Sequence, residues 1–238
     1  MGPKPRALQI LDGFSLLVIL AAVCLVFFYA PVEVVMGQVQ KVFYFHVATA
    51  WVGMLGFIAA AIAGILYLLK DDLRWDQAGL SAVEISLVFF LTAIVTGSIW
   101  ARPTWNTWWT WDPRLTTAAV VELIYLAYFL LRQGVDDHRK RARFSAVYAI
   151  FGALSVPLTF ISIRLLRTIH PVVVGQGAGS GSGGFNMIPS MQIAFFFSLF
   201  AFTVFFADLL WHRIRLEKMK RELQTLQEEE WGQIGGEL

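Results

Sequence analysis

Residues 47–69, VATAWVGMLGFIAAAIAGILYLL, contain no charged side chain. A helix needs roughly 17–25 mostly apolar residues to cross the hydrocarbon core of a bilayer, so this segment is long enough for one span. The whole chain of 238 residues has the same character, because 57% of it is hydrophobic and only 15% is charged. Soluble domains carry about 25% charged residues. The composition therefore predicts an all-α integral membrane protein.

Five other segments resemble residues 47–69 in length and hydropathy. We expect residues 1–212 to form a membrane domain of six transmembrane helices, and residues 213–238 to form a charged tail whose apolar spacing fits a short amphipathic helix. The first segment is as long as a full span, so we expect it to be a membrane helix rather than a cleaved signal. The six expected spans are approximately residues 14–35, 47–69, 81–100, 115–131, 145–163 and 191–211.

The distribution of basic residues predicts the orientation of these spans. If the N-terminus is cytoplasmic, all but five of the 19 Lys and Arg residues fall in cytoplasmic segments, as the positive-inside rule requires. We therefore expect a multi-pass protein of the cytoplasmic (inner) membrane with both termini in the cytoplasm. No basic surface interleaved with aromatic residues is evident, so we expect no nucleic-acid partner. The five outer basic residues are Lys41, Arg102, Arg114, Arg164 and Arg167.

The chain has one cysteine, Cys24, inside the first expected span. A single thiol excludes an internal disulfide. The chain also lacks a C-x-x-C motif, which excludes dithiol redox chemistry and covalent attachment of c-type haem to this chain.

Residues 105–116, WNTWWTWDPRLT, form the most unusual part of the sequence. Together with Trp100 they hold five of the nine tryptophans, in the expected outer loop between the third and fourth spans. If residues 104–112 are helical, Trp105, Trp108, Trp109 and Asp112 share one face. We then expect a short interfacial helix that offers a platform for a planar apolar ligand. The alternative is an aromatic belt, which explains one or two tryptophans at a span end but not five in one connection.

The dipeptide Asp112-Pro113 has a structural interpretation too. Aspartate before proline at the start of an apolar helix is typical of an N-cap followed by proline at the first helical position. The two roles are compatible, because a capped helix start would hold the aromatic platform rigidly.

Two of the four histidines flank the tryptophan cluster. His138 and His212 lie at the inner side and are expected to be ordinary interfacial residues, whereas His46 and His170 lie at the outer side. Each of the outer pair alone would more often be structural. Together, beside the tryptophans, they indicate a haem site, because imidazole is a common ligand of haem iron and two would give a six-coordinate iron. The outer cations available for the two haem propionates are Arg102, Arg114, Arg164 and Arg167.

Two further features are weaker candidates. Glu122 lies inside the fourth span, where a carboxylate is costly and is either functional or paired with a neighbouring helix. Residues 175–184, GQGAGSGSGG, are expected to be a flexible spacer after His170, with a mobile lid as the alternative.

The sequence resembles a known family at these residues. WNTWWTWDPRLT is similar to the tryptophan-rich WWD signature of membrane haem-handling proteins. The six spans, the length and the outer histidine on each side resemble the cytochrome c maturation protein C family, also called haem exporter protein C, over nearly the whole chain. One departure is Asn106, which stands where the family usually has glycine. The resemblance implies that His46 and His170 are the axial ligands of haem iron, and that the haem platform is Trp105, Trp108, Trp109, Trp111 and Asp112.

The resemblance also implies a function and partners. It implies binding of haem b at the outer, periplasmic face and delivery to a periplasmic haem chaperone, cytochrome c maturation protein E, during c-type cytochrome biogenesis. The implied membrane partners are the small single-span cytochrome c maturation protein D and the ABC transporter subunits, cytochrome c maturation proteins A and B, within the membrane lipid. We find no pair of nucleophile and base, so we expect no enzyme activity and place any covalent step on the chaperone.

Two other functions remain open. A transmembrane conduit for haem, working with an ABC transporter, would need polar or haem-sized features through the spans, yet only Glu122 and scattered Ser and Thr residues offer them, and the chain has no ATP-binding motif. A b-type cytochrome would place histidines at two depths in the membrane. Both candidate histidines are expected at one side, which disfavours this third function.

Overall fold

The computed structural model describes residues 3–33, 36–171 and 187–236. Within these ranges the chain is helical, apart from turns, loops and an isolated bridge between Glu33 and Gly37. Six helical stretches are long and apolar enough to cross a membrane, which confirms the expected all-α, multi-pass class. The helices are α1 (Arg6–Cys24) with the π-helical turn η1 (Leu25–Tyr29), α2 (Gln40–Lys70), α3 (Leu73–Trp105), α4 (Pro113–Gln133), α5 (His138–Ala153), α6 (Ser155–Leu165) and α7 (Pro189–Gly236).

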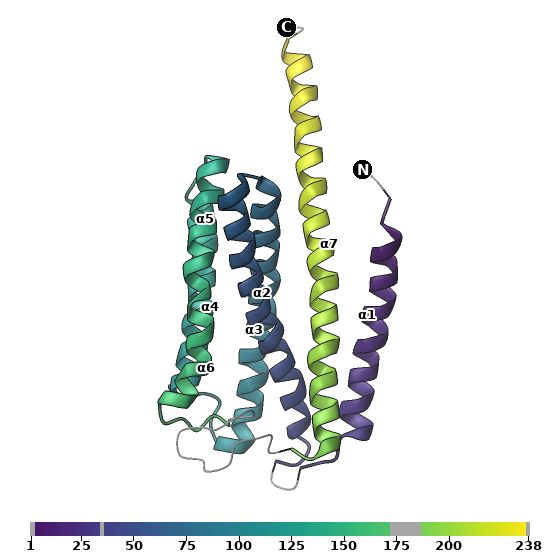
Figure 1. Cartoon of the computed structure of the whole chain (residues 1–238), viewed down its shortest axis with the longest axis vertical. Helices are drawn as coiled ribbons and strands as arrows, with labels where there is room; N and C mark the ends of the chain where they lie inside the picture. Colours follow the sequence, from purple (N-terminus) through teal and green to yellow (C-terminus); the bar gives the residue numbers. More distant parts are fainter. Residues whose placement is uncertain (1–2, 34–35, 172–186, 237–238) are drawn as a thin grey trace.

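Several helices extend beyond the apolar segments expected from the sequence. α2 begins at Gln40, so His46 lies inside a helix rather than before one. α7 continues to Gly236 and projects beyond the rest of the bundle (Figure 1). These extensions contain Lys, Glu, Gln and Arg, which form helices as readily as Leu does. The apolar segment therefore indicates where a helix could cross a membrane, whereas propensity and caps determine where it ends.

The fifth stretch is interrupted. α5 ends at Ala153 and α6 begins at Ser155, with Leu154 between them. Pro157 has no backbone N–H to donate to the carbonyl of Ala153, and its ring crowds that carbonyl, so a regular helix cannot run through this point.

The prediction of an interfacial helix over residues 104–112 is wrong. α3 ends with Trp105, and Asn106 follows in the left-handed conformation with φ 55°. Asparagine adopts this conformation more readily than other non-glycine residues, so it can replace the glycine usual at a helix end. The chain is then irregular until Asp112, and the Thr107 hydroxyl donates to the Trp109 carbonyl over 3.0 Å. The tryptophans therefore do not share a helical face.

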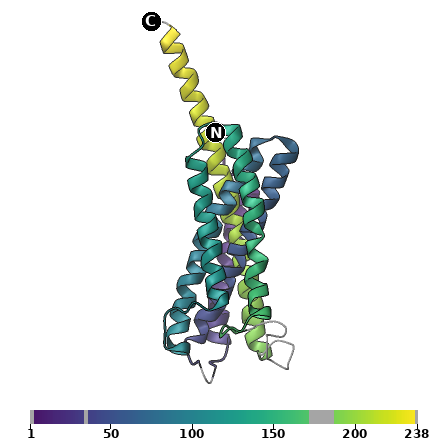
Figure 2. The same ribbon diagram turned by 90° about the vertical axis from the view of Figure 1, so that its left-hand side faces the viewer.

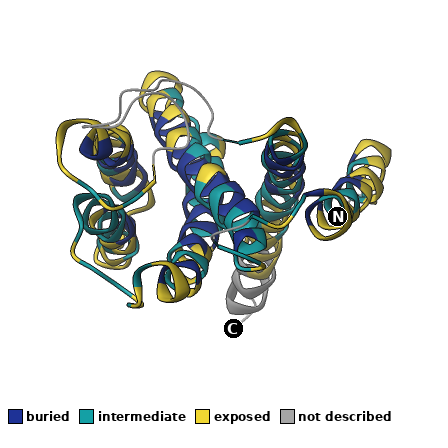
Figure 3. Cartoon of the chain, turned by 90° about the horizontal axis from the view of Figure 1, so that it is seen from below, coloured by how far each residue is buried: buried dark blue, intermediate teal, exposed yellow. Residues whose placement is uncertain are grey.

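The helices form three groups in space. α2 and α3 pack along each other at the centre, with α4, α5 and α6 on one side and α7 and α1 on the other (Figures 1 and 2). The main core lies among α2, α3, α4 and α5, where the rings of Phe57 and Tyr125 stack at 3.8 Å. Exposed residues lie on the outer sides of the helices (Figure 3), and many of them are large and apolar, such as Leu69 and Phe151. Such a surface suits lipid rather than water.

Both termini lie at one end of the bundle, and the connection between α3 and α4 lies at the other (Figure 1). α1 is peripheral and packs against α7 through Val18, Ala22 and Ala201. Near the end that carries the termini, the His212 Nε2 atom of α7 lies 2.8 Å from an Asp12 carboxylate oxygen of α1. His212 therefore has a structural contact far from the tryptophan cluster.

Candidate functional site

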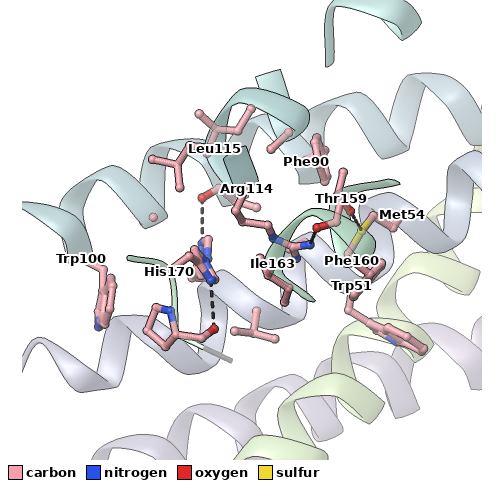
Figure 4. A pocket seen from close by; sticks show the side chains of 18 of the residues that line it. Trp51, Met54, Phe90, Trp100, Arg114, Leu115, Thr159, Phe160, Ile163 and His170 are labelled. Carbon is pink, nitrogen blue, oxygen red and sulfur yellow. Dashed lines mark hydrogen bonds between the residues drawn. The ribbon is translucent and has the colours of Figure 1, made fainter. Parts of the chain in front are cut away.

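A cavity of about 630 Å³ lies at the end of the bundle that carries the tryptophan cluster. Its volume falls within the range of about 300–1,000 Å³ that is usual for small-molecule sites. α2, α3, α4, α6 and α7 all contribute to its wall, which is mostly apolar (Figure 4). Both outer histidines, His46 and His170, line it. The structure thus brings together two residues that are far apart in the sequence.

His46 is held by a backbone carbonyl of the neighbouring helix. Its Nδ1 atom lies 2.8 Å from the carbonyl oxygen of Ala93 in α3. Because a carbonyl can only accept a hydrogen bond, Nδ1 carries a proton, and in the neutral ring Nε2 then keeps its lone pair. A neutral imidazole in this tautomer can ligate a metal through Nε2.

Gly97 makes room for this histidine. A Cβ atom built on Gly97 would lie 2.8 Å from Cε1 and 3.1 Å from Nδ1 of His46. No side chain fits at that distance without moving the imidazole ring. Gly97 was not predicted from the sequence, although an isolated glycine within a helical pattern is a signal of close packing.

His170 lies beyond the end of α6, and its Nδ1 atom is 3.0 Å from the carbonyl oxygen of Pro171. The same reasoning assigns the proton to Nδ1 and the lone pair to Nε2. Burial lowers the pKa of His170 to about 4, and the nearby Arg114 contributes to the effect. The imidazole is therefore neutral at physiological pH, as a metal ligand must be. The ring of Trp105 packs edge-on against it, with centroids 6.3 Å apart.

Asp112 connects the tryptophan segment to the segment that carries His170. The expected N-cap is confirmed, since one carboxylate oxygen accepts from the backbone N–H of Arg114 at 2.9 Å. The same carboxylate accepts from the Thr168 hydroxyl at 2.6 Å and from the Ile169 backbone N–H at 2.9 Å. One side chain therefore caps α4 and positions the two residues before His170. The cap was predicted from the Asp112-Pro113 dipeptide, whereas the hydrogen bonds to residues 168 and 169 were not predicted.

The tryptophans divide into two groups. Trp105, Trp108 and Trp109 line the cavity, and so does Trp100, whose ring packs edge-to-face on Trp105 at 5.3 Å. Trp111 lies outside the lining, is 78% exposed, and packs edge-to-face against Trp109 at 5.8 Å. Trp111 can support Trp109 but does not face a ligand in the cavity.

The four arginines proposed for the haem propionates also fall into two groups. Arg114 and Arg164 line the cavity, whereas Arg102 and Arg167 do not. The Arg114 guanidinium donates to the Thr159 carbonyl of α6 and lies 4.9 Å above the ring of Phe160 (Figure 4). It is therefore held in place at the cavity wall. Arg102 instead donates to the side chain of Asn106 at the end of α3.

Two weaker candidates remain, and one of them, Glu122, does not line the cavity. Glu122 is buried, and its Oε2 atom has no hydrogen-bond partner among the described residues, so the expected pairing is not seen for that atom. Residues 175–184 lie outside the described residues, and the choice between spacer and lid stays open. Much of the apolar wall was not predicted from the sequence, namely Trp51, Met54, Phe90, Phe160, Phe195, Phe196, Leu199 and Phe200.

The fold and the site define a multi-pass α-helical membrane protein with a tryptophan-lined cavity that presents two histidines, each with its Nδ1 atom at a backbone carbonyl. The family model of Heme exporter protein C (CcmC) matches residues 4–229. The chain is 34% identical over 199 residues to Heme exporter protein C of Bradyrhizobium diazoefficiens, which covers 83% of this chain and 74% of that protein. It is 28% identical over 218 residues to Heme exporter protein C of Escherichia coli K12, covering 89% of this chain and 86% of that protein.

A mitochondrial relative extends the comparison. The chain is 30% identical over 165 residues to a putative cytochrome c biosynthesis ccmC-like protein of Marchantia polymorpha, covering 69% of this chain and 70% of that protein. The chain belongs to the haem exporter protein C family, whose role is in cytochrome c biogenesis. The resemblance inferred from the tryptophan motif is thereby confirmed.

Proposed function

We propose that this protein binds haem b at the outer face of the membrane, with His46 and His170 as the two axial ligands of the iron. One observation carries the proposal: two imidazoles line one cavity, and each has its Nδ1 atom at a backbone carbonyl. Metal-ligating histidines usually donate their second ring N–H to such an acceptor, which fixes the tautomer and the ring orientation. The bound haem supplies the iron, and the protein supplies the two Nε2 lone pairs.

The rest of the cavity fits the remaining parts of haem. Trp100, Trp105, Trp108 and Trp109 offer flat apolar surface to a porphyrin. Arg114 and Arg164 are the cavity-lining cations, so we assign the propionates to them before Arg102 and Arg167. Trp111 and Asp112 act indirectly, through Trp109 and through the segment that carries His170.

Delivery requires an outer location for the site. The basic residues favour cytoplasmic termini, and the termini lie at the end of the bundle opposite the tryptophan cluster (Figure 1). The site then faces the periplasm from the inner membrane. From there the protein hands haem to the periplasmic chaperone, cytochrome c maturation protein E, while the single-span cytochrome c maturation protein D and the ABC transporter subunits A and B assemble with it. Any covalent bond to haem forms on the chaperone.

The two alternatives gain no support from the geometry. A conduit would need the cavity to extend towards the end that carries the termini, but the lining residues furthest along α2 and α7 are Met54 and Thr203, each 14 residues after the first residue of its helix. A b-type electron carrier would need ligands at two depths. His46 and His170 line the same cavity at one end.

Transfer to the chaperone tests the delivery step. The protein, loaded with haem in lipid nanodiscs, is mixed with the purified chaperone domain, and haem absorbance is followed in the two separated fractions. The proposal expects haem to leave the nanodisc fraction and appear with the chaperone. A nanodisc carrying haem but no protein serves as the control, and equal transfer from both would contradict a delivery role.

A further inference from the structure

The cavity opens at the side of the bundle as well as at its end. Several residues that line the cavity are also exposed at the bundle surface: Trp51 is 39% exposed, Phe160 37%, Phe196 48% and Phe200 48%. They belong to α2, α6 and α7, and none lies in the tryptophan segment. Exposed wall residues on α2, α6 and α7 are what a lateral opening of the cavity would leave.

This opening lies between two helices that do not touch. In the described part of the chain, no pair of Cα atoms from α6 and α7 lies within 8 Å, although α2 contacts both helices. α6 and α7 lie on opposite sides of the central α2–α3 pair (Figure 1). The face of α2 that carries Trp51 therefore forms the floor of the gap, and Trp51 lies at the edge of the cavity towards α7 (Figure 4).

The opening lies along a part of α2 that is long and apolar enough to span a membrane. Trp51 follows His46 by five helical residues and Met54 follows it by eight, which corresponds to roughly 7 Å and roughly 12 Å along α2 at about 1.5 Å per residue. The opening thus starts beyond His46, towards the middle of α2. The indole N–H of Trp51 is satisfied there, because it donates to the Thr203 hydroxyl of α7 over 3.1 Å.

We propose that the porphyrin exchanges sideways through this opening, between α6 and α7, with the outer leaflet of the surrounding bilayer. The inference rests on the proposed haem function and adds the route. The apolar macrocycle leaves lipid and enters a rim of aromatic rings, which is an apolar border for it. The cavity-lining cations available to the two propionates are Arg164 and Arg114, and Arg114 lies 4.9 Å from the centre of the Phe160 ring.

A bulky group placed in the opening tests the route. Full-length protein in lipid nanodiscs carries Cys24→Ser and one new cysteine, which is left free or coupled to pyrene maleimide. Phe196→Cys places the adduct in the opening. Ile193→Cys is the matched control, because Ile193 lies on the same helix, is 49% exposed and does not line the cavity. Haem is supplied from vesicles of the same lipid, and the Soret band is followed by stopped flow.

The adduct at position 196 is expected to slow haem uptake about tenfold or more, which equals about 1.4 kcal/mol on the barrier, while the final spectrum is unchanged. The adduct at position 193 is expected to leave the rate unaltered. An adduct on Trp108→Cys blocks the aqueous end instead. If that adduct slows uptake and the adduct at position 196 does not, haem enters from the aqueous face and the lateral route is wrong.

Two further results can be interpreted with variants and wild-type protein prepared in the same nanodiscs. If the adduct at position 196 abolishes binding, the double variant Phe196→Ala, Phe200→Ala is measured: a wider opening should accelerate uptake, and an unchanged rate overturns the route. If the wild-type protein shows no six-coordinate haem at all, the proposed function itself fails. Failure of the route alone leaves the wild-type spectrum intact.

Discussion

Gly97 is the residue on which the position of His46 depends most directly. We predict that Gly97→Ala weakens haem binding about tenfold or more, because the new methyl group would displace the imidazole from its hydrogen bond with Ala93. Haem titration followed at the Soret band measures the effect. Gly79→Ala on the same helix is the control, since its new Cβ would meet its nearest neighbours at 3.6 Å, an ordinary contact. Equal affinities of the two variants would contradict this role of Gly97.

Asp112 has two separable effects. Asp112→Ala removes a helix cap, which costs about 1 kcal/mol, and also releases Thr168 and Ile169 beside His170. We predict lower thermal stability together with a shift of the haem spectrum towards a five-coordinate form. Asp137→Ala removes the N-cap of α5, where the carboxylate accepts only from the start of its own helix. That control should leave the spectrum unchanged, and the same spectrum in both variants would show that Asp112 acts only as a cap.

At the scale of single residues, the sequence predicted the side chains that carry chemistry but not those that position them. His46, His170 and Arg114 could be proposed from residue type and location alone. Gly97 and the hydrogen bonds of Asp112 to residues 168 and 169 depend on which segments meet in space. A single sequence does not show which segments of the chain lie next to each other in the folded protein.

Between helices, one buried ion pair joins α3 to α4. The Arg132 guanidinium binds the Asp76 carboxylate through two hydrogen bonds of 2.6 and 3.0 Å, and both side chains are about one-tenth exposed. We predict that Arg132→Met destabilises the protein by about 3–5 kcal/mol, because Asp76 is left buried without its partner. The control, Arg74→Met, breaks an exposed pair with Asp72 and should change the melting temperature little. Similar melting temperatures of the two variants would contradict the prediction.

At the scale of elements, hydropathy located every long apolar helix but not the helix ends. The prediction of an interfacial helix was wrong because Asn106 takes a left-handed conformation, which ends the helix. The spacing of the tryptophans does not indicate that conformation. The break at Leu154 could have been predicted from Pro157. The polar continuation of α7 was expected only in part, as a short amphipathic helix.

For the whole molecule, the predicted orientation can be measured by thiol labelling in cells. In a Cys24→Ser background, Trp111→Cys and Gln224→Cys each place one thiol at an exposed position, at opposite ends of the bundle. A membrane-impermeant maleimide should label position 111 in intact spheroplasts and position 224 only after lysis. The reverse pattern would place the tryptophan cluster in the cytoplasm and exclude delivery to a periplasmic chaperone.

The complete site could be predicted only in outline. Composition and basic residues indicated a membrane protein with a site at one end, and the tryptophan motif indicated the family. The cavity wall could not be predicted, because residues such as Phe160 and Phe200 look the same in sequence whether they face lipid, a neighbouring helix or a ligand.

The haem spectrum of the histidine variants tests the central claim most directly. Wild type, His46→Ala, His170→Ala and the control His212→Ala are purified in detergent, and haem content and Soret spectra are recorded with and without added imidazole. The structure predicts six-coordinate haem in wild type and in His212→Ala, because His212 lies far from the cavity and contacts Asp12. Loss of haem or a shifted spectrum, with recovery by imidazole, is predicted for the other two variants. Unchanged spectra in both would contradict ligation by His46 and His170.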